Sequence, residues 1–275
     1  MKRGPGSIYR RAKSIQLLVT RDRADIVRFV RSKRIELSMR QRLTLVRRLT
    51  RVTNAVRGYH TLGEILEITT EILERDRPVV VEAGVGPGSS TVKLSIATKL
   101  AGGRLFAFDT FRGIPDNDEV HTHLGGPLGG RQLVFRKGAF RATLPRVQRA
   151  IDQWGEPGLT RLIKGRVEET LPNLDTHVDV AILDLDLIAS TRAAILALWP
   201  KLVPGGVLLS IDGQLRATHE LLADKSFWNQ DLGCDPPAIH GLWRDKLLRI
   251  EKTDSASPET PRGSSCRASD SDCTK

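Results

Sequence analysis

Cysteine is scarce in this chain of 275 residues, which contains Cys234, Cys266 and Cys273 alone. These three form neither a C-x-x-C pair nor a disulfide framework. No apolar run approaches the roughly 20 residues that a membrane-spanning helix requires. The apolar piece IQLLV near the start is too short for a secretory signal and runs directly into TRDRAD. We therefore expect a reduced, cytoplasmic protein.

Acidic residues are nearly missing from the beginning of the chain. Residues 1–60, here called the basic arm, hold 17 Lys and Arg against three Asp and Glu, whereas the remainder holds 26 against 29. The net charge of +11 therefore belongs to this arm. Such a run can be a solvated helix face, a contact for an anionic membrane surface, or a contact for nucleic acid. Its few aromatics (Tyr9, Phe29 and Tyr59) argue against stacking on bases and hence against a nucleic-acid partner.

Apolar periodicity divides the chain into three parts. Residues 1–60 are predicted to be a helical extension, and residues 253–275, polar throughout, a disordered tail. Residues 61–252 alternate apolar strands with helices, which predicts an α/β domain with a doubly wound, mostly parallel sheet. The predicted strands are 78–84, 104–109, 161–165, 178–186 and 205–212, with 246–252 at the sheet edge, and the predicted helices are 89–101, 141–153, 190–199 and 216–227.

The stretch VVVEAGVGPGSSTVKLS, residues 79–95, joins the first of these strands to a helix through Gly84, Gly86 and Gly88. Ligands of doubly wound folds bind beyond the carboxyl ends of the strands, and glycines there let the backbone approach the ligand. The loop lacks the Lys of a triphosphate-binding P-loop and the G-x-G-x-x-G spacing of a nicotinamide-dinucleotide site. Its E-x-G-x-G-x-G pattern fits S-adenosylmethionine better, although a plain tight turn remains the alternative for a lone glycine loop.

Polar residues around the loop complete the predicted cofactor site. Glu82 can bind the ammonium of the methionine end of the cofactor, while the loop amides face its carboxylate. Ser89 or Ser90 can cap the following helix and also hold an anionic group. Asp109 ends the second strand, where its carboxylate can bind both ribose hydroxyls, and Thr110 follows it. Together these residues predict the binding of an adenosyl cofactor.

Five stretches then follow in order: VEAGVGPGSSTVKLS, FAFDTFRGIPDNDE, GAFRATLPRV, IKGRVEETLP and VDVAILDLDLIASTRAAILALWPKLVPGGVLLSIDG. Over roughly residues 60–250 they resemble the macrocin O-methyltransferase family, class I methyltransferases that act on sugar hydroxyls of natural products and related glycosides. The resemblance implies a Rossmann-like class I fold, S-adenosylmethionine as cofactor, and a small-molecule or glycan acceptor. It also implies that Gly165 and Arg166 contact the adenine and that Asp184 lies beside the transferred methyl group.

The resemblance further implies Mg²⁺, bound by Asp184 and by an Asp pair after the fifth strand. In this sequence Asp212 matches the first member of the pair, and Gly213 stands at the second. Mg²⁺ tolerates several water ligands, so the two carboxylates, with water or with Gln214, can still form a site. Alternatively, Asp184 and Asp212 are ordinary carboxylates at strand ends.

Methyl transfer to a hydroxyl needs a group that accepts its proton. Asp184 is the first candidate, and His121 and His123, in the loop EVHTHLGG, are the next. The glycine-rich stretch HLGGPLGGR can close over an acceptor, although two histidines one residue apart can also be plain loop residues. His219 is a further candidate, and His60 is interpreted as structural.

Three other functions stay open at this point. The first is methylation of nucleic acid or of another small molecule, but the N-P-P-[FYW] motif does not follow the fourth strand, where DLDLIAS stands. The second is a catalytically decayed cofactor-binding partner protein, which Gly213 keeps open. The third is a nicotinamide oxidoreductase. We expect an S-adenosylmethionine-dependent O-methyltransferase that forms a homo-oligomer.

Overall fold

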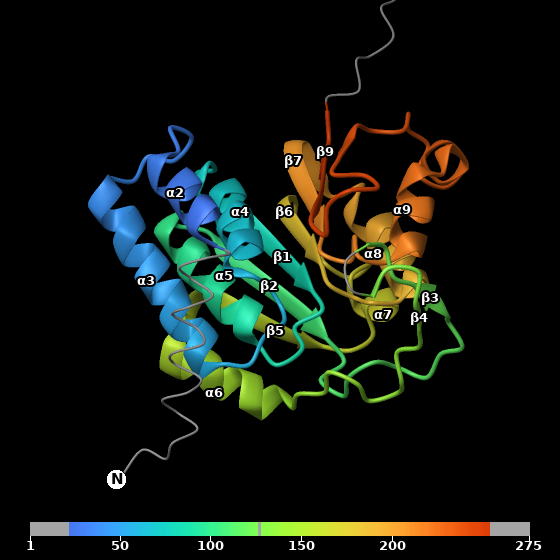
Figure 1. The fold of residues 1–275 in the computed structure, drawn as a ribbon, viewed down its shortest axis with the longest axis horizontal. Coiled ribbons are helices and arrows are strands. Elements are labelled where there is room, and N and C mark those ends of the chain that lie inside the picture. Colours follow the sequence, from blue (N-terminus) through green and yellow to red (C-terminus); the bar gives the residue numbers. More distant parts are fainter. Residues whose placement is uncertain (1–21, 126–127, 254–275) are drawn as a thin grey trace, which may run out of the picture.

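The computed structural model describes residues 22–125 and 128–253, and its centre is one seven-stranded sheet (Figure 1). The strand order is β5-β2-β1-β6-β7-β9-β8. The first five strands pair in parallel, whereas β9 runs antiparallel to both of its neighbours. The strands are β1 (Val79–Ala83), β2 (Arg104–Asp109), β5 (Thr160–Lys164), β6 (Val178–Leu183), β7 (Leu202–Ser210), β8 (Ile239–His240) and β9 (Leu248–Glu251).

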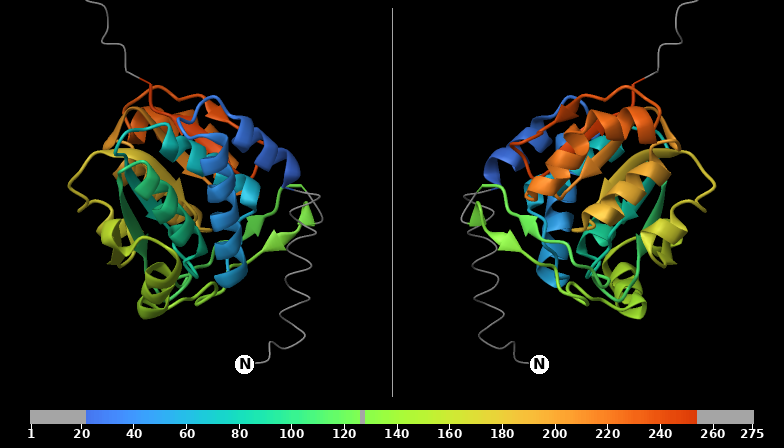
Figure 2. Two further views of the ribbon diagram at one scale, coloured as in Figure 1. Left: turned by 90° about the vertical axis from the view of Figure 1, so that its left-hand side faces the viewer. Right: turned by 90° about the vertical axis from the view of Figure 1, so that its right-hand side faces the viewer.

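Helices cover both faces of this sheet, as the two side views of Figure 2 show. One face carries α2 (Arg23–Arg31), α3 (Met39–Ala55), α4 (Leu62–Leu73), α5 (Ser89–Leu100) and α6 (Leu144–Trp154). The other face carries α7 (Val167–Thr170), α8 (Ile188–Leu198), α9 (Arg216–Ala223) and the π-helical turn η3 (Phe227–Asp231), while the short 3₁₀ turn η2 (Pro157–Leu159) precedes β5. The predicted doubly wound α/β fold with a mostly parallel sheet is therefore confirmed.

The predicted elements are all present, with two differences at the end of the chain. The strand predicted at 246–252 is β9, but it lies between β7 and β8 and does not form the edge of the sheet. The helix predicted at 216–227 ends at Ala223, because Asp224 turns the backbone to an extended conformation before η3 begins. In addition, two parallel strands end earlier than predicted, β6 at Leu183 and β7 at Ser210, so that Asp184 and Asp212 follow the strands.

Helices α2 and α3, which fall within the basic arm, pack into the same core as α5 and α6. Buried Phe29 and Leu49 belong to one apolar cluster with Val92 and Val147. Burial of large apolar side chains is the main stabilising term in such packing. Residues 1–21 and 254–275, which contain the start of the arm and nearly all of the predicted disordered tail, lie outside the described residues. Within the described residues, no helix is both long and apolar enough to cross a membrane.

A long excursion, residues 110–143, connects β2 to α6. It carries a small antiparallel pair, β3 (His121–Thr122) with β4 (Gln132–Leu133), and β3 packs against α9 on the far side of the sheet. Glu119 fixes its course, because its carboxylate accepts hydrogen bonds from Ile188 N (2.7 Å) and Ala189 N (3.0 Å) at the start of α8. A carboxylate is favourable at this end of a helix, where backbone N–H groups lack partners. The excursion is thereby held over the carboxyl ends of the strands.

Candidate functional site

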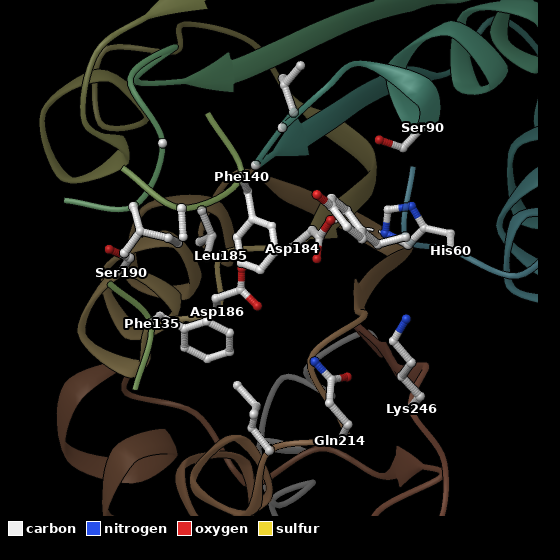
Figure 3. Close-up of a pocket in the computed structure, with 18 of the residues that line it drawn as sticks. His60, Ser90, Phe135, Phe140, Asp184, Leu185, Asp186, Ser190, Gln214 and Lys246 are labelled. Atoms are coloured by element: carbon white, nitrogen blue, oxygen red, sulfur yellow. Dashed lines mark ion pairs between the residues drawn. The ribbon is translucent and has the colours of Figure 1, made fainter. Parts of the chain in front are cut away.

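A cavity of about 960 Å³ opens at the carboxyl ends of the parallel strands, beneath this excursion. In a doubly wound fold this is the place where ligands bind. The walls come from segments that are far apart in the sequence, and Figure 3 shows Ser90 and Lys246 on opposite walls with Asp184 between them. Its lining includes the segments 58–60, 84–87, 108–110, 123–125, 184–186, 213–215 and 243–244, together with Lys246. One wall is formed by the glycine loop and the end of β2, and the other by the excursion and the chain after β7.

Asp109 accepts hydrogen bonds from two backbone N–H groups of the glycine loop and from one that follows β2. Asp109 Oδ2 accepts from Val85 N (2.8 Å) and Gly86 N (3.0 Å), and its Oδ1 accepts from Phe111 N (2.6 Å). Gly84 has φ of 96°, and a Cβ there would overlap the carbonyl oxygen of Asp184. The Thr110 hydroxyl lies 3.5 Å from Asp109 Oδ1 as a fourth, long hydrogen bond. The binding of ribose hydroxyls by this carboxylate stays a prediction.

Glu82 is buried behind the loop and does not line the cavity. Burial raises the pKa of its carboxyl group to about 7. Its Oε2 is buried and has no hydrogen-bond partner in the described part of the chain. An unpaired buried carboxylate oxygen is costly, so this atom is available to a cation or hydrogen-bond donor placed beside it. Ser89 and Ser90, at the start of α5, do line the cavity.

On the floor of the cavity, Asp184 pairs with a histidine that the sequence interpretation left as structural. His60 Nε2 lies 3.0 Å from Asp184 Oδ2, as the dashed line in Figure 3 marks. The side chain of His60 is 5% exposed and that of Asp184 30% exposed, so Asp184 presents the pair to the cavity. Burial lowers the pKa of His60, but the hydrogen bond and the charge of Asp184 outweigh it, and the pKa lies above its ordinary value. No sequence motif marks His60, which lies in the connection between α3 and α4.

Two further carboxyl groups, Asp186 and Asp212, lie next to this pair. Asp212 Oδ2 accepts hydrogen bonds from Leu185 N (2.9 Å) and Asp186 N (3.1 Å), so it shapes the turn after β6. Asp186 lines the cavity and has φ of 61°, a conformation that Asp tolerates better than most residues. Burial, followed by repulsion from neighbouring carboxylates, raises the pKa of Asp186 to about 9 and that of Asp212 to about 7. Burial and the neighbouring carboxylates thus favour the protonated form of Asp186, which can donate a hydrogen bond.

The predicted Mg²⁺ ligands do not come together as a set. Within residues 22–125 and 128–253, no group of three His, Cys, Asp or Glu side chains has the geometry of a metal site. Oδ2 of Asp184 and Oδ2 of Asp212 are already bound by His60 and by two amides, which leaves Asp212 Oδ1 as a buried oxygen without a partner. A Cβ at Gly213 would overlap the carbonyl oxygen of Asp245, so the missing second Asp has no room. The described residues therefore do not fit the implied magnesium site.

Aromatic rings from the α3–α4 connection and the excursion line part of the cavity. Tyr59 and Phe140 meet edge to face at 5.0 Å between ring centroids, and Phe135 lies 6.0 Å from Phe140. Among the described non-glycine residues, only five have positive φ, and Phe140, Asp186 and Trp243 of these line the cavity. Such conformations are strained and cluster at functional sites. The acceptor-facing wall is thus built from residues whose backbone is held in uncommon conformations.

Trp243 is the most exposed of these rings, at 50%, and its place is fixed by His219 beneath it. The two rings stack at 5.0 Å, Trp243 N donates to His219 Nδ1 (2.8 Å), and His219 Nε2 lies 2.6 Å from Gly213 O. His219 is fully buried, so its role in the structure is to position Trp243. A half-exposed tryptophan held in this way offers a flat apolar surface to a ligand.

The other predicted residues divide between the cavity wall and the interior. His123, Thr110 and Arg166 line the cavity. His121 does not: it is 1% exposed, its Nε2 lies 3.3 Å from Glu119 Oε2, and its ring packs against Phe135 at a tilt of 57°. Gly88 and Gly165 also lie outside the lining, each with a positive φ that a turn requires. The described geometry thus gives Asp184 and His123, but not His121, access to a bound acceptor.

Comparison with known proteins agrees with this architecture. Residues 81–212 match the model of a family described as "Methyltransferase domain". Over 150 residues the chain is 28% identical to 8-demethyl-8-(2,3-dimethoxy-alpha-L-rhamnosyl)-tetracenomycin-C 4'-O-methyltransferase from Streptomyces olivaceus. That alignment covers 53% of this chain and 56% of the relative, so the chain spans little more than half the length of this protein.

Among solved structures, the O-methyltransferase NovP is similar with a TM-score of 0.56 and 18% identity, over 71% of this chain and 83% of NovP. The calicheamicin methyltransferase CalS11 is similar with a TM-score of 0.50 and 18% identity, over 91% of this chain and 94% of CalS11. At this level of identity the likeness concerns the fold.

Proposed function

We propose that this protein is an S-adenosylmethionine-dependent O-methyltransferase that acts on a hydroxyl of a sugar-bearing or polyhydroxylated small molecule. One observation carries the proposal: a single cavity joins the glycine loop held by Asp109 to the Asp184–His60 pair. The methyltransferase-domain match over residues 81–212 and the sugar O-methyltransferase relative support the reaction and the class of acceptor. Within this class, the ordered motifs support membership of the macrocin O-methyltransferase family.

In this proposal the glycine-loop wall binds the cofactor. Asp109 accepts a hydrogen bond from the ribose, and Ser89, Ser90 and the loop amides face the methionine carboxylate. Glu82 Oε2, buried and without a partner, is the acceptor for the ammonium, directly or through water. Thr110 and Arg166 line the adenine end. Gly88 and Gly165 contribute their turn conformations and no direct contact.

The Asp184–His60 pair performs the proton chemistry in this proposal. Bound S-adenosylmethionine would supply a methyl group that is already activated, so the protein has to orient the acceptor oxygen and remove its proton. Asp184 accepts that proton, because it faces the cavity and its Oδ1 receives no hydrogen bond from the described residues. His60 is a positioning residue that holds Oδ2 of Asp184. Protonated Asp186 donates a hydrogen bond to a second acceptor oxygen, and no step requires Mg²⁺.

The acceptor binds between the aromatic wall and the chain after β7. Trp243 and Phe135 offer apolar faces that suit the carbon-bearing face of a sugar ring or a flat aglycone. His123, on the excursion, lies in the same wall and is a second candidate for contact with the acceptor. We also propose that the protein acts in the cytoplasm, as its three cysteines suggest. The predictions of a homo-oligomer and of an anionic membrane partner stay predictions, the latter resting largely on residues 1–21.

The proposal is tested by transfer of a radiolabelled methyl group from S-adenosylmethionine to a panel of rhamnosides and other glycosides. We expect label in a product whose new methyl ether lies on a sugar carbon. The matched control is the Asp184→Asn variant, which we expect to bind the cofactor without forming product. Binding of S-adenosylmethionine with no transfer to any acceptor would instead favour the decayed partner protein.

A further inference from the structure

A second cavity, of about 330 Å³, adjoins the first. Tyr59, Pro87 and Phe140 line both, so the two cavities share a wall beside the glycine loop. The rest of its lining consists of Gly138, Arg57, Arg141 and Arg146. We call this second cavity the arginine cavity. No acidic residue of the described chain lines it. Three exposed arginines therefore line a space that shares a wall with the main cavity.

The arginines of this cavity have no carboxylate partners. Elsewhere, partly exposed arginines form ion pairs, as Arg34 does with Glu74 and Arg48 with Glu156. In the described residues, no such ion pair involves Arg57, Arg141 or Arg146. Arg57 instead packs on the face of Tyr59, with 5.2 Å between its Cζ and the centroid of the ring. Three positive side chains on one cavity, with no carboxylate among its lining residues, favour a bound anion over a bound cation. The charges in this cavity are thus available to a ligand.

The start of α6 adds to the positive potential. Its first turn contains Arg146 and no acidic residue, and the side chain of its N-cap, Thr143, makes no capping hydrogen bond. A helix N-terminus carries a partial positive charge, so an arginine there is unfavourable unless an anion lies nearby. This arrangement supports the arginine cavity as an anion site and gives no support to a cation or an apolar ligand.

We propose that the arginine cavity binds the phosphate or diphosphate group of the acceptor, so that the methylated sugar is a sugar phosphate ester. This inference rests on the proposed function, because it extends the acceptor site of that reaction. Arginine binds phosphate oxygens in a bidentate manner, and three guanidinium groups suit a group with more than one negative charge. The phosphate ester can come from a nucleotide-linked or a lipid-linked sugar. Both place a diphosphate next to the sugar ring.

The first experiment is a calorimetric titration of the full chain with inorganic pyrophosphate at low ionic strength. We expect one saturable site whose affinity falls at least about tenfold in the Arg141→Gln/Arg146→Gln double variant, since charged hydrogen bonds are lost. Arg149→Gln is the matched control, because Arg149 is an exposed arginine of the same helix that does not line the cavity. An equal loss in the control, or no saturable binding to the unchanged chain, would overturn the proposal.

Two further titrations test the connection with the acceptor. Tighter binding of UDP than of pyrophosphate identifies a nucleotide-linked sugar, and tighter binding of farnesyl diphosphate identifies a lipid-linked one; either result supports the proposal. If neither binds more tightly than pyrophosphate, the arginines hold an isolated anion, and the assignment to the acceptor is wrong.

S-adenosylhomocysteine separates this inference from the proposed function. We expect the double variant to bind it as tightly as the unchanged chain does. If the double variant binds S-adenosylhomocysteine more weakly than the unchanged chain does, the arginines bind the carboxylate of the cofactor. That result would overturn the proposal that they bind the acceptor. A failure of the unchanged chain to bind it would contradict the proposed function, whatever pyrophosphate does.

Discussion

The two walls of the main cavity are built in different ways. The cofactor-facing wall consists mainly of one continuous loop, residues 84–90, and its carboxylate brace, Asp109, which binds it through backbone N–H groups. The acceptor-facing wall is assembled from side chains that come from the α3–α4 connection, the excursion and the chain after β7. A backbone loop recognises a cofactor that does not change, whereas side chains can be exchanged to fit another acceptor.

The difference predicts that changes at the two walls have separable effects on the protein. Replacement of Asp109, which holds the glycine loop, should weaken cofactor binding. Replacements in the acceptor-facing wall should change acceptor binding alone. Asp184 lies where the walls meet, so its replacement should affect the chemistry and leave both ligands bound.

The largest effect is expected for Asp184→Asn. Because Asp184 is the proposed proton acceptor, kcat should fall by about 100- to 10,000-fold, the range that general-base catalysis provides. Affinity for S-adenosylhomocysteine, measured by calorimetry, should be unchanged. Asp116→Asn, in an exposed ion pair with Lys137, is the control and should keep full activity. Retained turnover in the Asp184 variant would remove this residue as the base.

Asp109→Ala should give the next largest effect, on the cofactor wall alone. The loop amides of Val85 and Gly86 lose their acceptor, and the ribose loses a charged hydrogen bond worth about 1.5–3 kcal/mol. We expect the affinity for S-adenosylhomocysteine to fall roughly 10- to 100-fold. Circular dichroism should show the fold intact. Unchanged affinity would mean that Asp109 braces the loop without contributing to the cofactor site.

Trp243→Leu tests the acceptor wall and should have a smaller effect. Loss of a stacking surface worth about 0.5–1.5 kcal/mol should raise KM for the acceptor roughly 2- to 10-fold and leave kcat and cofactor affinity unchanged. Trp243→Phe should recover most of the loss. A change in kcat with KM constant would place Trp243 near the reacting atoms and contradict the assignment.

Asp186→Asn should change stability with pH. The folded state holds a proton on Asp186 up to a pKa of about 9, whereas the unfolded state releases it near 3.8, so the stability of the unchanged chain falls as pH rises between these values. Asn carries no charge and tolerates the positive φ. The variant should therefore melt above the unchanged chain at pH 8, by roughly 2–4 °C for each kcal/mol recovered, and at nearly the same temperature at pH 4. Equal melting temperatures at both pH values would show that Asp186 has an ordinary pKa.

These contrasts also explain how far the sequence could predict the molecule. The strands and the loop 84–88 follow from local patterns, because apolar runs and glycine spacing are properties of contiguous residues. His60, Asp186 and Trp243 could not be found in this way. His60 and Trp243 carry no motif, and tertiary packing alone brings the connection after α3 and the turn before β9 to the end of β6. Asp186 lies in the stretch VDVAILDLDLIAS, but its place in the cavity wall and its raised pKa depend on the groups packed around it. The lack of room at Gly213 is equally a property of the fold, since it depends on the chain around Asp245.

The most direct test of the central claim is a calorimetric titration of the full chain with S-adenosylmethionine, repeated with Mg²⁺ and with EDTA. We predict saturable binding at one site per chain, with the same affinity in all three conditions, because the described residues offer no magnesium site. An affinity that rises with Mg²⁺ and falls with EDTA would show that Asp212 Oδ1 belongs to a metal site after all. Absence of cofactor binding in every condition would contradict the assignment of the protein as a methyltransferase.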